Sequence, residues 1–256
     1  MTPRLYIDTP LEMGAVAPLS ATQAHYLKNV LRLEVGASVV LFNGRDGEYA
    51  AEIAELKKKG GLAKITAKTR EQQSEPELQL LFAPVKRGPL ETIIQKAVEI
   101  GAARLSPVIT ERTIAPKINV ARLQAIAIEA AEQCGRLTVP QVDEPVKFAR
   151  VLAAWPEDRQ LMFCDEAGED KNQEWGGREG RALPVLDALK TFDSKSHSWA
   201  VLTGPEGGFT GQERATLRAR EFVTPVTLGP RILRADTAAI TALALWQAAL
   251  GDWRRS

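Results

Sequence analysis

Two glycine-proline segments in the second half of the chain contain residue types that suit ligand binding. The first, Gly204-Pro-Glu-Gly-Gly208, directly follows the apolar run Trp199–Thr203. The second, Gly229-Pro-Arg-Ile-Leu-Arg234, directly follows Val223–Leu228. In parallel α/β sheets, ligands bind beyond the carboxyl ends of the strands, where glycine lets backbone N–H groups come close to them. The same spacing also suits two tight turns, so it leaves both interpretations open.

Charged side chains accompany both glycine segments. Arg231 and Arg234 can neutralise an anion beside a ligand, although arginines in a loop are more often simply solvated. Glu206 lies inside the first segment. Asp236 precedes a long apolar stretch and is a good candidate for the N-cap of a helix. These four residues are the candidates for chemistry.

Other common types of site find little support in the sequence. Neither segment has the GxGxxG or GxxxxGK[ST] spacing of nucleotide-binding loops, and no GxSxG motif is present. The two histidines, His25 and His197, have no metal-ligand spacing, so no metal site is expected. Cys134 and Cys164 form no CxxC pair, which indicates a reducing compartment without a disulfide framework. We therefore expect a cytoplasmic protein.

The composition is that of a globular protein without a membrane segment. The chain has 256 residues, of which 45% are hydrophobic and 25% charged, and its formal net charge is +1. No apolar run is long enough to span a membrane, and the start of the chain lacks a signal-peptide pattern. With a net charge so close to zero, any contact with nucleic acid must come from a local group of Lys and Arg.

The elements around the glycine segments alternate between strand and helix. Predicted strands cover Leu78–Val85, Leu105–Ile109, Gln160–Cys164, Trp199–Thr203 and Val223–Leu228. One predicted helix starts near Pro89 and ends at Gly101, and another is capped by Asn119. This alternation predicts a parallel sheet with helices on both faces. The glycine-rich, charged stretch Asp165–Arg181 is predicted to be a surface loop.

The first part of the chain is patterned differently. Short strands are predicted over Arg4–Asp8, Ser38–Phe42, Glu48–Leu56 and Leu62–Thr66, with one helix at Thr22–Leu33. These elements favour a small β-barrel with a helix. The polar stretch Thr69–Glu77 is typical of a linker. The expected domains are therefore residues 1–72 and 77–256.

The motifs taken together resemble a known family along essentially the whole chain. LTGPEGGF at 202–209 and LGPRILRADTA at 228–238 resemble the bacterial 16S ribosomal RNA uridine (uracil-N3) methyltransferases of the SPOUT superfamily. Further matches are KR at 86–87, IQKAVEIG at 94–101, ITERT at 109–113 and EAAEQCGR at 129–136. HYLKNVLR at 25–32 resembles the family's PUA-like RNA-binding β-barrel. The resemblance implies an α/β trefoil-knot methyltransferase domain over residues 77–256, preceded by a PUA-like domain over residues 1–72.

The resemblance also implies an activity and its site. The cofactor would be S-adenosylmethionine and the substrate 16S ribosomal RNA, within the assembled small subunit, with the enzyme acting as a homodimer. The implied cofactor-binding residues are Thr203, Gly204, Glu206, Gly207, Gly208, Leu228, Gly229, Ile232 and Leu233. For catalysis, Arg234 would stabilise the uracil anion, and Glu206 or Asp236 would accept the proton. The implied RNA contacts are Arg32, Lys86, Arg112 and Arg136. One departure is Ala235-Asp236, where relatives usually have Thr-Glu.

Two other functions stay open from the sequence. A SPOUT enzyme that methylates another RNA position, such as a ribose 2′-hydroxyl, would share the fold. An RNA-binding or ribosome-assembly factor without activity would share it too, but its cofactor loop would be damaged. The stretch Gly204–Gly208 is intact.

Overall fold

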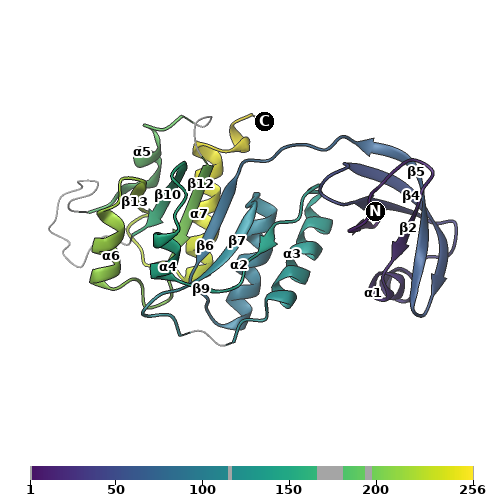
Figure 1. Cartoon of the computed structure of the whole chain (residues 1–256), viewed down its shortest axis with the longest axis horizontal. Coiled ribbons are helices and arrows are strands. Elements are labelled where there is room, and N and C mark those ends of the chain that lie inside the picture. The colour runs from purple at the N-terminus through teal and green to yellow at the C-terminus, as the bar shows by residue number, and fades with distance from the viewer. Residues whose placement is uncertain (1, 115–116, 166–180, 194–197, 256) are drawn as a thin grey trace. The chain divides into compact units, whose positions relative to one another are not determined.

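The computed structural model describes residues 2–114, 117–165, 181–193 and 198–255. The chain divides into two compact units, one of residues 1–74 with 128–139 and one of residues 75–127 with 140–256 (Figure 1). The first unit therefore includes residues 128–139, which the sequence had assigned to the second domain. No helix in the described residues is long and apolar enough to cross a membrane.

The small unit is built on a five-stranded sheet. Its strands are β1 (Arg4–Tyr6), β2 (Val16–Leu19), β3 (Ser38–Phe42), β4 (Glu48–Lys57) and β5 (Gly60–Arg70). Their order is β1-β3-β4-β5-β2, with β1 parallel to β3 and the other pairs antiparallel. The inward-facing residues form one apolar cluster that includes Leu5, Leu41, Ile53 and Ile65. The prediction of a separate small β domain at the start of the chain is confirmed.

The helix predicted over Thr22–Leu33 is different in the structure. Helix α1 (Ala21–His25) begins after Ser20, whose hydroxyl accepts the Gln23 N–H while the Gln23 side chain accepts the Ser20 N–H. A π-helical turn, η1 (Tyr26–Val30), follows. Arg32 then ends the helical segment with a left-handed φ of 57°. The prediction of one regular helix was thus wrong, because the second half is a π-helical turn. The predicted end at Leu33 was also wrong, because the turn ends at Val30.

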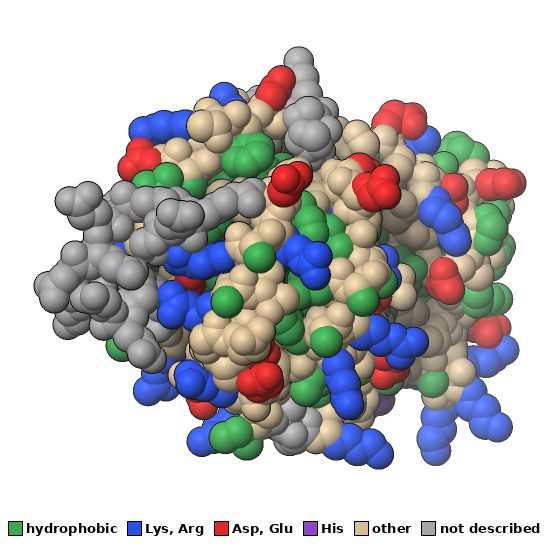
Figure 2. All heavy atoms as spheres, turned by 60° about the vertical axis from the view of Figure 1, so that its left-hand side comes forward, with side chains coloured by type: hydrophobic (Ala, Val, Ile, Leu, Met, Phe, Trp, Pro, Cys, Tyr) green, Lys and Arg blue, Asp and Glu red, His purple; other side chains and the backbone are tan. Residues whose placement is uncertain are grey.

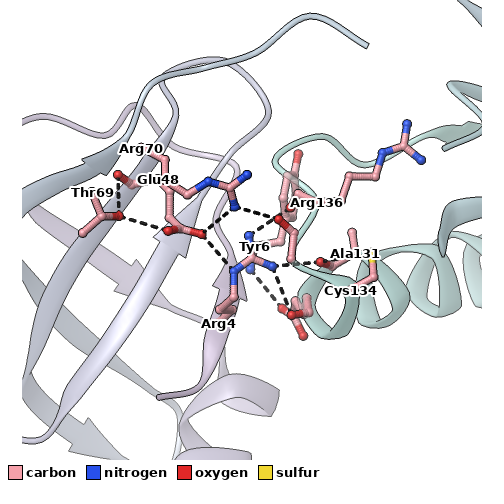
Figure 3. A network of polar contacts seen from close by, with 10 residues as sticks. Arg4, Tyr6, Glu48, Thr69, Arg70, Ala131, Cys134 and Arg136 are labelled. Carbon is pink, nitrogen blue, oxygen red and sulfur yellow. Dashed lines mark hydrogen bonds and ion pairs between the residues drawn. The ribbon is translucent and has the colours of Figure 1, made fainter. Parts of the chain in front are cut away.

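Arg4 explains why residues 128–139 belong to the small unit (Figure 3). The last carbonyls of helix α3 (Val120–Cys134) have no partner within the helix. Arg4 Nη1 donates to the carbonyls of Ala131 and Glu132, at 2.9 and 3.1 Å, and Nη2 donates to the carbonyl of Arg136 at 3.0 Å. Its Nε lies 3.0 Å from Glu48 Oε2 on β4. The sheet thus caps the end of α3.

The large unit contains a parallel sheet, as predicted. In spatial order its strands are β11 (Leu183–Pro184), β13 (Val223–Thr227), β10 (Arg159–Cys164), β12 (Ser198–Thr203), β6 (Leu78–Phe82), β7 (Arg104–Ile109) and β8 (Gln141–Val142). The short strand β9 (Val146–Lys147) pairs with β7. All these pairs are parallel. The helices are α2 (Arg87–Ile100), α4 (Phe148–Ala153), α5 (Val185–Leu189), α6 (Gly211–Arg218), α7 (Ala235–Ala249) and the 3₁₀ turn η2 (Asp252–Arg255).

Helices cover both faces of this sheet, which confirms the predicted arrangement of helices on both faces. On β12, Ala200 and Leu202 join an apolar cluster with Phe148 of α4 and Leu217 of α6. The side chain of Trp199 points to the opposite face of the sheet from Ala200 and lies against α7. Its ring centroid is 6.4 Å from that of Trp246. The expected caps are also present. Gly101 ends α2 in the left-handed conformation, and Asn119 Oδ1 accepts the Arg122 N–H at 3.1 Å.

Helix α7 contributes an apolar face to the core of the large unit. Leu243, Trp246 and Leu250 are buried, and Leu245 is half-buried. The N-cap interpretation of Asp236 is wrong, since Arg234 occupies the N-cap position. Asp236 is the second helical residue, and its Oδ1 accepts the Thr237 N–H at 2.9 Å. The trefoil knot stays a prediction.

Candidate active site

The two glycine segments follow neighbouring ends of the sheet. Strand β10 lies between β12 and β13, with Phe163 paired to Leu202 and Cys164 paired to Val226. Because the three strands are parallel and their last residues are level, the chain leaves them at one edge. We call residues 204–209 the first loop and residues 228–234 the second loop. Their position matches the place where parallel sheets bind ligands.

The first loop is held by close backbone and aromatic packing. A Cβ atom at Gly204 would lie 2.7 Å from Cε2 of Phe209, so this position requires glycine. Phe209 is buried and packs edge-on against Phe163 of β10 at 5.1 Å between centroids. Gly208 has a φ of 64°, and its N–H donates to the Pro205 carbonyl at 2.9 Å. Thr203, which precedes the loop, is buried, whereas Glu206 and Gly207 are exposed.

The second loop is more open. The Thr227 hydroxyl bonds to both the N–H and the carbonyl of Gly229, at 3.3 and 3.2 Å, and so holds the start of the loop. Leu228 and Leu233 are half-buried. Ile232 is 87% exposed, which is a large apolar surface to leave in water. This loop can therefore offer apolar contacts to a ligand.

The predicted catalytic residues lie on the two loops and in the first turn of α7. Glu206 and Arg234 are exposed, and Asp236 is half-buried in the first turn of α7. No ion pair joins these three residues to one another among the interactions of the described chain. The structure thus presents the guanidinium and the carboxylates at the edge of the sheet without pairing them.

The four predicted RNA contacts have different environments. Lys86 is exposed at the start of α2, after β6. Arg32 is exposed in the small unit. Arg112 is exposed, but its Nη1 donates to the Gly207 carbonyl at 3.0 Å. Arg136 is only 8% exposed, and its Nε donates to Thr138 Oγ1 at 2.9 Å, so an RNA contact there stays a prediction.

The structure reveals a buried carboxylate at this edge that the sequence did not identify. Asp165 was predicted to open a surface loop, yet it is 3% exposed at the end of β10. Arg214 Nε and Arg218 Nη2 of α6 each lie 2.7 Å from its oxygens. The rest of that predicted loop, residues 166–180, lies outside the described residues. Asp165 thus connects α6 to the central strand.

Glu213 is a second residue that sequence reasoning missed. It is 4% exposed in the first turn of α6, where it forms a capping box with Thr210. Its Oε1 also accepts the Glu111 N–H, at 2.9 Å, from the loop after β7. The signal was available, since T-x-x-E before a helix is a capping-box pattern.

Thiol and metal chemistry find no support in the described geometry. Burial raises the pKa of the Cys164 thiol to about 12, helped by the neighbouring Asp165 charge, so the thiol stays protonated near neutral pH. Within residues 2–114, 117–165, 181–193 and 198–255, no three His, Cys, Asp or Glu side chains are grouped to hold a metal ion.

Comparison with known proteins decides the family. Residues 72–247 match the model of an RNA methyltransferase domain, and residues 19–66 match that of an RNA methyltransferase PUA domain. The ribosomal RNA small subunit methyltransferase E of Rickettsia conorii is 31% identical over 242 residues, covering 94% of this chain and 93% of that protein. The chain belongs to the ribosomal RNA small subunit methyltransferase E family.

Further proteins resemble the chain over nearly its whole length. The Synechocystis protein is 33% identical, over 95% of this chain and 77% of its own length. The crystal structure of the Neisseria gonorrhoeae enzyme bound to S-adenosyl methionine has a TM-score of 0.82 at 29% identity, covering 99% and 100% of the two chains. A putative methyltransferase from Legionella pneumophila, in complex with the same cofactor, has a TM-score of 0.80 at 31% identity, covering 98% and 99%.

Proposed function

We propose that this chain transfers a methyl group from S-adenosylmethionine to N3 of a uridine in 16S ribosomal RNA. The observation that carries the proposal is the pair of glycine loops at one sheet edge, in a chain that matches the methyltransferase E family from end to end. The cofactor supplies an electrophilic methyl group on a sulfonium. The protein must bind it, exclude water and present an activated uracil.

The two loops fit such a cofactor. Glycine backbone in the first loop can approach polar groups of the ligand closely, and exposed Ile232 in the second can cover an adenine ring. The proposed binding residues are those implied by the resemblance, namely Thr203, Gly204, Glu206, Gly207, Gly208, Leu228, Gly229, Ile232 and Leu233. Contacts of this kind hold the methyl donor in place and align it with the attacking nitrogen.

Arg234 is the proposed stabiliser of the uracil anion. A neutral uracil carries a proton on N3 and is a poor nucleophile, so negative charge develops on the ring when that proton leaves. Arg234 is exposed and occupies the N-cap position of α7, where the helix adds its own positive end. A guanidinium placed there favours the transition state electrostatically.

Glu206 is the stronger candidate for the proton acceptor. Its carboxylate is exposed on the first loop and is engaged by no other described group. Asp236, the alternative, already accepts the Thr237 N–H through Oδ1. A free carboxylate beside the substrate is better placed to take a proton.

Lys86 and Arg32 are the proposed RNA contacts. Both are exposed, one in each unit, and neither forms an ion pair with another described residue. Figure 2 shows further Lys and Arg side chains, with Asp and Glu side chains among them, on the face turned toward the viewer. Local groups of this kind provide the phosphate contacts that a net charge of +1 does not predict. Since N3 takes part in base pairing, the target uridine must be unpaired or flipped out.

The proposed setting is the cytoplasm, with the assembled small subunit as substrate and a homodimer as the active form. The apolar face of α7 is buried within the unit, so a dimer would use other surfaces. Light scattering on purified protein tests the dimer. A molar mass of about 28.0 kDa would contradict it, because that is the mass of one chain.

A methylation assay tests the function as a whole. Purified protein and labelled cofactor are incubated with small subunits or with naked 16S RNA, and the modified nucleoside is identified by mass spectrometry. We expect 3-methyluridine, preferentially on the subunits. A ribose methyl would instead assign the chain to 2′-hydroxyl chemistry. Failure of the folded protein to bind the cofactor in calorimetry would favour a non-enzymatic assembly factor.

A further inference from the structure

The first loop and the helix that follows it, α6, are attached to the loop that follows β7 at two separate points. Arg112 Nη1 donates to the Gly207 carbonyl at 3.0 Å and to the Phe209 carbonyl at 3.5 Å. Four positions after Phe209, in the first turn of α6, the carboxylate of Glu213 accepts the Glu111 N–H at 2.9 Å. The adjacent residues Glu111 and Arg112 therefore hold the start of α6 and the second half of the first loop, respectively.

Glu213 does more than cap its own helix. Its Oε2 accepts the Thr210 N–H at 2.9 Å, which completes the capping box. That box needs one oxygen only. The second oxygen is used for the amide of Glu111, 102 positions away. A 4%-exposed carboxylate with both oxygens engaged is a strong link, because breaking it leaves buried polar groups unsatisfied.

Residues 110–113, directly after β7, form a hydrogen-bonded turn, which makes them a suitable support. Thr113 Oγ1 accepts the Thr110 N–H at 2.9 Å and lies 2.7 Å from Thr110 Oγ1. The Thr113 N–H donates back to the Thr110 carbonyl at 3.2 Å. Thr110 is buried at the end of β7. Arg112 and Glu111 thus project from a closed turn.

We propose that Arg112 and Glu213 are positioning residues, which brace the first loop in the conformation that receives the cofactor. The proposal rests on the proposed function, in which the first loop binds S-adenosylmethionine. A loop with three glycines among six residues would otherwise lose much conformational entropy on binding. Bracing removes part of that cost before the ligand arrives. Arg112 then serves the cofactor, and RNA phosphates are contacted by other cations.

Replacing Arg112 distinguishes bracing from RNA contact. Arg112→Lys keeps the charge but loses the geometry of a guanidinium that reaches two carbonyls. We expect roughly tenfold weaker binding of S-adenosylmethionine in calorimetry, while RNA affinity and its salt dependence stay unchanged. Lys117→Ala, an exposed cation on the same connection, is the matched control and should change cofactor affinity by less than twofold. Unchanged cofactor affinity with reduced RNA affinity in Arg112→Ala would overturn the proposal.

Glu213→Gln tests the second point of attachment. The side chain keeps its size but has one acceptor oxygen instead of two, so one of the two amides loses its partner. We again expect roughly tenfold weaker cofactor binding at unchanged kcat under saturation. In the double variant with Arg112→Lys the losses should be less than multiplicative, because both residues brace one loop. Fully multiplicative losses would mean that the two residues act independently, contrary to the proposal.

Hydrogen exchange tests the brace without any cofactor. In the unliganded protein, amides of residues 206–209 should exchange faster in Arg112→Lys than in the wild type, with the core of β12 unchanged. Equal exchange rates of these amides in both proteins would overturn the proposal that Arg112 holds the loop, even if the wild type binds the cofactor. Faster exchange in a protein that binds no cofactor would uphold the brace and reject the proposed function.

Discussion

Gly204 and Phe209 are in direct contact across the first loop, since a Cβ atom at position 204 would lie 2.7 Å from Cε2 of the phenylalanine ring. The ring cannot move freely, because it packs against Phe163 and Phe148. The loop therefore depends on glycine at this position for a steric reason. By contrast, a Cβ at Gly207 would meet only Arg112, at 3.6 Å, which is an ordinary contact.

The first prediction compares these two glycines. Gly204→Ala should displace the ring or the loop, destabilise the large unit by about 1–3 kcal/mol and weaken cofactor binding at least tenfold. Gly207→Ala should have nearly wild-type stability, because its Cβ meets only an ordinary contact with Arg112. Urea unfolding and calorimetry measure both quantities. If the two variants behave alike, packing against Phe209 is not what determines the loop.

The second prediction concerns Arg234. Arg234→Ala should lower kcat by about 10²–10³, the usual effect of removing one group that stabilises developing negative charge. Cofactor affinity should stay unchanged, since the role is in the reaction step. Arg231→Ala, an exposed arginine of the same loop, is the control. Equal kcat in wild type and Arg234→Ala at saturating substrates would remove the residue from the mechanism.

The third prediction is a trade-off at Arg32. This residue follows the end of a helical segment in the left-handed conformation, where glycine is usual and an L-residue is strained by about 1–2 kcal/mol. Arg32→Gly should therefore stabilise the small unit by about 1 kcal/mol while weakening RNA binding and reducing its salt slope by about 1. Arg32→Lys should retain most of the binding. A variant that gains stability and binds RNA normally would show that the strain serves another purpose.

The fourth prediction concerns the attachment of α3 within the small unit. Arg4→Ala removes bonds to three carbonyls and to Glu48, so we expect a loss of about 1–3 kcal/mol in the unfolding of that unit. Arg45→Ala, whose ion pair with Asp8 is exposed, should cost less than about 0.5 kcal/mol. Denaturant unfolding measures the free energy of unfolding of both variants. Hydrogen exchange of residues 128–134 then measures how well the end of α3 is held. Unchanged exchange there would mean that α3 is held by other contacts.

The fifth prediction follows from the two cysteines. Cys134 is exposed, whereas burial raises the pKa of Cys164 from its ordinary value of 9.0 to about 12. Between pH 7 and 8.5, a thiol reagent should label Cys134 readily and Cys164 only after unfolding. The raised pKa also means that the Cys164 thiol stays protonated to a higher pH in the folded state than in the unfolded state. Stability should therefore be independent of this thiol below pH 9 and decline between pH 9 and about 12, and Cys164→Ala should remove that decline.

The sequence alone determined the class of fold and predicted a place for the site. Strand-helix alternation after residue 77 predicted the parallel sheet, and the glycine segments after Thr203 and Leu228 predicted where a ligand would bind. These features are readable because they depend on periodicity and on residues that are neighbours in the chain. The chain-length resemblance identified the family, which the comparisons confirmed.

Tertiary structure decided which charged residues remain available. Arg136 and Asp165 look like surface residues in sequence, yet long-range packing buries both. Arg112 finds its carbonyl partner 95 positions away, and Glu213 finds its amide partner 102 positions away. Contacts of that range leave no local periodicity, because they depend on how strands β7 and β12 are placed in one sheet. The glycine loops were therefore predictable, and the residues that brace them were not.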